Sequence, residues 1–73
     1  MQNHTMNELI FVVEESLDGG YEAKAIGEPI FTQGEDLEDL KNQIKEAVNC
    51  HFEENKMPKM VRLHFVKDEV FAI

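Results

Sequence analysis

Acidic side chains are the first candidates for chemistry in this sequence, because paired carboxylates can hold Mg²⁺ for phosphodiester cleavage. Five of them fall within one short stretch: Glu14, Glu15, Asp18, Glu22 and Glu28. The pattern places them mainly in turns or on the outward side of strands, where carboxylates are usually solvated. We therefore expect an acidic rim here, and a metal-dependent hydrolase or nuclease is the least favoured function.

His51 and Glu54 lie one turn apart near the end of a predicted helix and could supply two metal ligands. A metal site needs three or four ligands, and no predicted strand offers the others. We expect His51 to be packed and hydrogen-bonded instead, since the end of a helix favours such a residue. Cys50 is expected to be a half-buried structural thiol, and His64 alternates away from the helix. The sequence predicts no catalytic residue, no metal site and no cofactor.

The charge balance disfavours several classes of partner. Seven Lys and Arg residues stand against 15 Asp and Glu residues, which gives this chain of 73 residues and 8.4 kDa a net charge of −8. Nucleic acids and anionic lipids are held by basic surfaces, so we expect neither direct nucleic-acid binding nor membrane binding. The acidic charge favours a basic protein as partner.

The N-terminal residues and the cysteine content predict a cytoplasmic location. The first eight residues lack the basic region and apolar stretch of a secretory signal. The longest apolar run, residues 9–13, is far shorter than the roughly 20 residues that span a bilayer. Cys50 is the single cysteine and cannot form an internal disulfide.

The hydrophobic pattern predicts one domain over residues 1–73, with residues 1–6 disordered. Alternating β-branched and aromatic residues predict four strands, which turn residues separate. The predicted strands start near Glu8, Tyr21, Ile30 and Met60. We expect residues 69–73 to form either a short fifth strand or an arm.

Between the third and fourth strands, apolar residues recur at three- and four-residue steps, which predicts a helix. Its apolar face comprises Leu37, Leu40, Ile44, Ala47, Val48 and Phe52. Asp36 is the expected N-cap, and the helix should end near Asn55, because the residue before Pro58 disfavours helical geometry. The outward side carries an acidic stripe: Asp39, Glu46 and Glu53. This stripe is either an ordinary solvated face or a docking surface for a basic partner.

These elements predict an α+β fold in the order β-β-β-α-β, in which an antiparallel sheet carries one helix on one face. A single helix covers one face only, so apolar side chains on the opposite face need another cover. The candidates are Ile10, Val12, Ile26 and Val66. We expect a homo-oligomer, a dimer or higher, formed through these open faces or through edge strands. The alternative is that they are ordinary scattered surface aliphatics.

Three short segments follow one another in a characteristic order and spacing: Gly19-Gly20-Tyr21, Gly34-Glu35-Asp36 and Glu46-Ala47. Together they resemble the N-terminal domain of HicB-type antitoxins. In that family a strand led by Gly-Gly-Tyr is followed by a short strand, a helix start similar to Gly-Asp-Thr, and a helix with a Glu-Ala pair. The resemblance covers residues 8–52. It implies a partial ribonuclease-H-like fold without the catalytic carboxylate cluster.

The sequence departs from the family pattern in three places. Residues 27–31 stand where the family has a Pro-x-x-Pro-Gly-Cys-like segment, and Asp36 stands where it tends to carry a Thr or Ser cap. HicB-type antitoxins commonly continue into a DNA-binding domain, whereas this sequence ends at Ile73. We therefore expect a standalone domain that does not bind an operator, which agrees with its acidic charge.

The resemblance implies a non-enzymatic protein-binding domain that neutralises a small basic ribonuclease toxin by covering its RNA-binding surface. The acidic stripe is the candidate for this contact, although the resemblance does not itself assign these three residues. The alternative function is an orphan structural or regulatory homodimer of the same fold that has no toxin partner.

Overall fold

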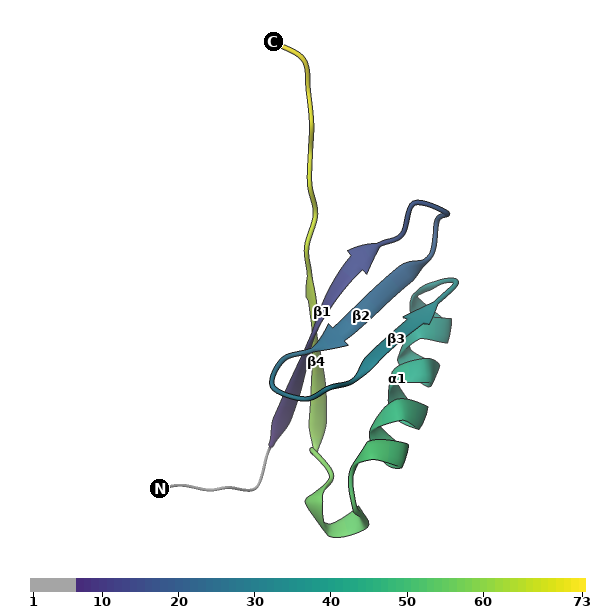
Figure 1. The fold of residues 1–73 in the computed structure, drawn as a ribbon, viewed down its shortest axis with the longest axis vertical. Coiled ribbons are helices and arrows are strands. Elements are labelled where there is room, and N and C mark those ends of the chain that lie inside the picture. Colours follow the sequence, from purple (N-terminus) through teal and green to yellow (C-terminus); the bar gives the residue numbers. More distant parts are fainter. Residues whose placement is uncertain (1–6) are drawn as a thin grey trace.

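The computed structural model describes residues 7–73, so the prediction of disorder for residues 1–6 lies outside the described residues. Within this range, strands and helices follow one another as Figure 1 shows. They are β1 (Glu8–Glu15), β2 (Tyr21–Ala25), β3 (Phe31–Gly34), α1 (Leu37–His51), a short 3-10 helix (Glu54–Lys56) and β4 (Met60–Phe65). The predicted α+β class and the β-β-β-α-β order are confirmed.

The strands form one mixed sheet in the order β3-β2-β1-β4. β1 pairs with β2, and β2 with β3, in antiparallel fashion. β4 pairs with β1 in parallel, with Leu63 opposite Phe11, so the prediction of an antiparallel sheet is wrong for this strand. The reason is the connectivity. β3 runs in the same direction as β1, α1 runs back, and β4 therefore runs with β1 again (Figure 1).

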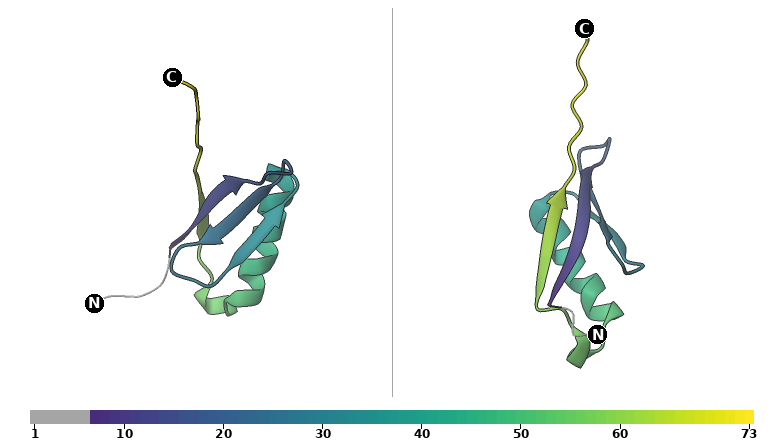
Figure 2. Two further views of the ribbon diagram at one scale, coloured as in Figure 1. Left: turned by 45° about the horizontal axis from the view of Figure 1, so that its top comes forward. Right: turned by 90° about the vertical axis from the view of Figure 1, so that its left-hand side faces the viewer.

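One face of the sheet packs against α1. Alternate residues of β1 point to this face, where Leu9, Phe11 and Val13 are buried. The rest of the core comprises Ala23, Ala25, Ile30, Leu40, Ile44 and Val48. α1 packs mainly against β2 and β3, so the helix-facing side of β4 is poorly covered (Figure 2). Val61 and Phe65 on that side remain 40% and 50% exposed.

The start of α1 is fixed by two side-chain caps. Asp36 is the N-cap, as predicted, and its Oδ1 accepts a hydrogen bond of 2.7 Å from the backbone N–H of Asp39. The Asp39 carboxylate in turn accepts a 2.9 Å hydrogen bond from the N–H of Glu35. The first bond satisfies a backbone donor of the first helical turn, and the second holds the residue before the N-cap against that turn. Both carboxylates suit the positive end of the helix dipole.

The helix ends at His51, earlier than the predicted end near Asn55. Phe52 adopts an extended conformation, and its side chain packs against the core. Burial of this aromatic side chain turns the chain out of the helix before Pro58 is reached. The prediction that Leu37 lies on the buried apolar face is wrong, because Leu37 is 38% exposed.

Residues 66–73, which we call the arm, form no fifth strand in the described chain. The N–H of Val66 still donates to the carbonyl of Val13 at 2.9 Å, which extends the β1–β4 ladder by one bond. Beyond it the arm projects away from the sheet (Figures 1 and 2). Of the two predicted forms of residues 69–73, the structure has the arm. Its apolar side chains Val70, Phe71 and Ile73 are exposed.

No helix in the described part of the chain is long and apolar enough to cross a lipid bilayer.

Candidate interaction surfaces

The β1–β2 turn and the start of α1 lie at the same end of the molecule (Figure 1), and residues of both line a polar recess. Three acidic residues line this recess, and five more lie on the neighbouring strand ends and the first helical turn. We call these eight of the 15 acidic residues the acidic end: Glu14, Glu15, Asp18, Glu22, Glu35, Asp36, Glu38 and Asp39. None of the eight takes part in an ion pair within residues 7–73. Four of the five carboxylates predicted to form an acidic rim belong to this end, and Glu28 lies elsewhere.

The strand register makes the acidic end electrostatically unfavourable by itself. Glu14 lies directly opposite Glu22 on neighbouring antiparallel strands. Like charges in this position repel, at a cost on the order of a few tenths of a kcal/mol. Lys67 lines a shallow recess with Glu14 and Glu15, without an ion pair between them. The acidic end is therefore a surface where a positively charged partner would lower the electrostatic energy.

The structure separates the three residues of the predicted acidic stripe. Glu46 lies on α1 and is exposed, as the stripe requires. Asp39 is half-buried, and its carboxylate serves the cap of α1. Glu53 is exposed but lies beyond the end of the helix, because Phe52 has already left it. The stripe is thus not one continuous helix face, although Glu46 and Glu53 remain accessible to a partner.

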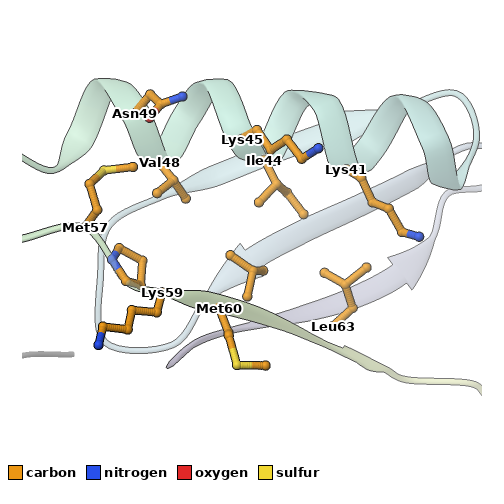
Figure 3. A pocket seen from close by; sticks show the side chains of 11 residues that line it. Lys41, Ile44, Lys45, Val48, Asn49, Met57, Lys59, Met60 and Leu63 are labelled. Carbon is orange, nitrogen blue, oxygen red and sulfur yellow. The ribbon is translucent and has the colours of Figure 1, made fainter. Parts of the chain in front are cut away.

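An apolar groove of about 410 Å³ separates α1 from β4 and the segment that leads into it. Figure 3 shows Ile44 and Val48 on the helix side, and Met57, Met60 and Leu63 on the other. Three lysines border this groove: Lys41, Lys45 and Lys59. The groove exists because α1 lies over β2 and β3 and leaves the helix-facing side of β4 open.

The sheet face opposite the helix holds the four residues predicted to form an oligomer interface. Ile10 and Val12 are half-buried, while Ile26 and Val66 are 57% and 39% exposed. Polar neighbours flank the first two in the sheet: Arg62 beside Ile10, and Lys24 and His64 beside Val12. The role of this face in self-association remains a prediction.

Arg62 also ties β4 to the start of β1. Its guanidinium donates a hydrogen bond of 2.8 Å to the Glu8 carboxylate. This hydrogen bond and the negative charge of Glu8 raise the pKa of Arg62 above its ordinary value. Arginine is already charged throughout the physiological range, so the pair contributes to the packing of neighbouring strands and does not act as a switch.

His51 is hydrogen-bonded, as predicted, and its partner is Glu28 of the β2–β3 loop; the prediction that His51 is packed is wrong, because it is exposed at the end of α1. The two side chains meet at 2.9 Å between Nε2 and Oε1, and the His51 ring also contacts the edge of Phe52. Cys50 is exposed, so the prediction of a half-buried thiol is wrong; its position on α1 points away from the core. His64 is exposed on β4. Among residues 7–73, no three His, Cys, Asp or Glu side chains converge as a metal site.

Sequence reasoning did not predict the groove or the full acidic end. The four-residue spacing of Lys41 and Lys45 around Ile44 was a signal for a basic rim beside an apolar floor. The acidic end has no local signal, since it joins residues 14–22 to residues 35–39 through the pairing of β2 with β3. Tertiary contacts alone bring these segments together.

Comparison with known proteins places the chain in a family. No protein-family model and no solved structure matches it. A protein from Thermotoga maritima is 48% identical over 69 residues, which cover 94% of this chain and 97% of that protein. A protein from Archaeoglobus fulgidus is 56% identical over 52 residues, which cover 71% of this chain and 77% of that protein. Both are named UPF0150 protein, a name that states no activity, ligand or partner. With this identity over nearly its whole length, the chain belongs to the UPF0150 family.

Proposed function

We propose that this chain is a non-enzymatic, HicB-antitoxin-like domain with a partial ribonuclease-H-like fold. It binds a small basic ribonuclease in the cytoplasm and covers the surface with which that enzyme holds RNA. The observation that carries the proposal is the acidic end, where eight carboxylates gather without an ion pair in the described chain. The resemblance of residues 8–52 to HicB-type antitoxins supports it independently.

Charge complementarity would hold the two proteins together. A ribonuclease holds the RNA phosphates with basic side chains, and an acidic protein surface can occupy the same side chains. Carboxylates such as Glu14 and Glu22 repel each other in the unbound domain, and a basic partner would offset this cost. Complementary charge would also accelerate the encounter between the two proteins and select against acidic partners.

The side chains that could suggest catalysis have other roles in this proposal. His51 links the helix end to the β2–β3 loop through Glu28. His64 and Cys50 lie on exposed surfaces of different elements. The domain would act by steric occlusion alone, so its effect on RNA cleavage would depend on binding stoichiometry.

The partner to test is a small basic protein encoded next to the gene for this chain. The two proteins should co-purify after co-expression, and titration should give a defined stoichiometry. If no adjacent gene encodes such a protein, or if the two purified proteins do not associate, the proposal fails.

Two matched double variants locate the contact, since each removes two negative charges. Glu14→Gln with Glu22→Gln alters the acidic end, and Glu46→Gln with Glu53→Gln alters what remains of the acidic stripe. We expect the first pair to weaken binding by about tenfold or more, and the second pair to have a smaller effect. If the second pair weakened binding more than the first, the contact would lie on the outward side of α1 instead.

A further inference from the structure

The arm carries apolar side chains that find no cover in their own chain. Val70, Phe71 and Ile73 are 94%, 76% and 115% exposed. Water-exposed apolar groups of this size, close together on one extended segment, favour burial against another surface. Two acidic residues, Asp68 and Glu69, precede them. The arm is therefore an acidic and apolar extended segment without a neighbour in the described structure.

The groove between α1 and β4 has the complementary character. Its floor is apolar, formed by Ile44, Val48 and Leu63, and Lys41, Lys45 and Lys59 stand along its border (Figure 3). β4 is also an edge strand, so its outer backbone groups have no strand partner within residues 7–73. Such an edge accepts a further strand readily.

The arm cannot easily fill the groove of its own chain. It leaves the end of β4 that lies farthest from Met57 and Met60, and it points away from the sheet (Figures 1 and 2). A return along β4 would need a tight reversal at residues 66–69. These residues are Val-Lys-Asp-Glu, and Asp68 is the single residue among them that favours a turn. An extended path into a second molecule requires no reversal.

The alternation of side chains along β4 fixes which arm residues would face the groove. Val61, Leu63 and Phe65 share the helix side of the sheet with Leu9, Phe11 and Val13. If the same alternation continues, Phe71 and Ile73 fall on the helix side as well, and so does Glu69. The arm has eight residues and β4 has six, so antiparallel pairing would cover the whole edge strand.

We propose that two copies of this chain exchange arms. Each arm pairs in antiparallel fashion with the outer edge of β4 in the other copy, and Phe71 and Ile73 cover its groove. Glu69 then lies on the lysine-bordered side of the partner's groove, and the two sheets join into one continuous sheet. A two-fold axis relates the copies, so the same contact forms twice. The proposal does not depend on the toxin-binding function.

The exchange is tested by measuring the mass of the purified chain in solution without any other protein. At tens of micromolar, light scattering should give a mass near twice the 8.4 kDa of one chain. Phe71→Asp with Ile73→Asp should raise the dimer dissociation constant by about 100-fold or more and return the mass to that of one chain. Both side chains are exposed in the single molecule, so these substitutions leave its fold intact.

Two further variants separate this interface from the opposite sheet face. Val61→Glu alters the groove side of β4 and should also give monomers, whereas Ile26→Asp on the opposite face should remain dimeric. Circular dichroism would confirm that each variant is folded. A parent chain with the mass of one copy overturns the proposal, as does a dimer that survives the arm substitutions but dissociates with Ile26→Asp.

A mixing experiment tests the exchange itself. The arm variant retains an intact groove, and Val61→Glu retains an intact arm, so a mixture of the two can form one of the two contacts. Fluorescence transfer between labelled copies should report heterodimers in the mixture and none in either variant alone. If the mixture stays monomeric at concentrations far above the parent dissociation constant, the arm does not bind the groove of a second copy.

Discussion

Gly20 and Gly34 are required by close backbone approaches rather than by unusual φ angles. In the β1–β2 turn, Gly19 has a positive φ of 99°, whereas Gly20 does not have a positive φ. A Cβ atom on Gly20 would lie 2.7 Å from the carbonyl oxygen of Gly34, and one on Gly34 would lie 2.5 Å from the backbone nitrogen of Leu40. These contacts join β2, β3 and α1, so no local pattern could predict them.

Gly34→Ala should therefore destabilise the domain by about 1–3 kcal/mol, because the added methyl group overlaps the backbone of α1. Chemical denaturation would measure this loss. Gly19→Ala is the control: nothing lies within 4 Å of its Cβ position, so it should lose about 1 kcal/mol through backbone strain alone. An equal or smaller loss for Gly34→Ala would contradict the packing argument.

The hydrogen bond of His51 also depends on a tertiary contact that the local sequence does not predict. The sequence predicted a hydrogen-bonded histidine at the helix end but could not identify the acceptor. Glu54 lies near in sequence, yet Glu28 from the β2–β3 loop makes the contact. The early end of α1 explains the choice, since Phe52 takes the following residues away from the helix axis.

At the scale of elements, the helix was the best predicted part of the fold. Its N-cap and the buried residues Leu40, Ile44 and Val48 agree with the three- and four-residue spacing. Its end and the exposure of Leu37 were predicted wrongly, because both depend on how α1 crosses the sheet. The direction of β4 likewise depends on where the chain returns to the sheet after α1. The alternation of apolar residues along β4 carries no information about this direction.

The cap of α1 should contribute measurably to stability. Asp36→Ala removes the acceptor for the N–H of Asp39, and we expect the free energy of unfolding to fall by about 1 kcal/mol. Asp36→Ser restores an oxygen that can accept the same bond, so most of the stability should return in thermal unfolding. A serine variant as unstable as the alanine variant would show that the cap is not the cause.

The helix also offers a matched pair of leucines. Leu40 is fully buried, so Leu40→Ala should destabilise the domain by about 2–5 kcal/mol through lost burial and a residual cavity. Leu37 is only one turn away but exposed, and Leu37→Ala should cost less than about 1 kcal/mol. Urea denaturation of both variants would measure the two losses in the free energy of unfolding. Similar losses would contradict the exposed position of Leu37.

At the scale of the whole molecule, the net charge was known from the sequence but its distribution was not. The fold concentrates carboxylates at the acidic end and places Lys41, Lys45 and Lys59 around the groove. The separation arises because β2–β3 pairing joins two acidic segments that lie apart in the chain. It gives one small domain two surfaces of different character: the acidic end, which the proposed function assigns to a basic partner, and the lysine-bordered groove, which the proposed exchange assigns to a second copy.

The charge distribution predicts a strong dependence of toxin binding on salt. The association rate with a basic ribonuclease should fall by about tenfold or more between low and physiological ionic strength, because salt screens electrostatic steering. The dissociation rate should change less. Stopped-flow fluorescence over a salt series would measure both rates, and an association rate independent of salt would contradict an electrostatic contact at the acidic end.

The central claim is tested most directly by the RNA-cleaving activity of the proposed partner, a small basic ribonuclease encoded beside this chain. Purified chain would be titrated into a fixed amount of that ribonuclease, with the acidic-end variant Glu14→Gln and Glu22→Gln titrated in parallel. The proposed function predicts that cleavage stops at a fixed molar ratio of chain to ribonuclease, and that the variant requires a higher concentration. Cleavage that continues unchanged with the chain in excess would contradict it.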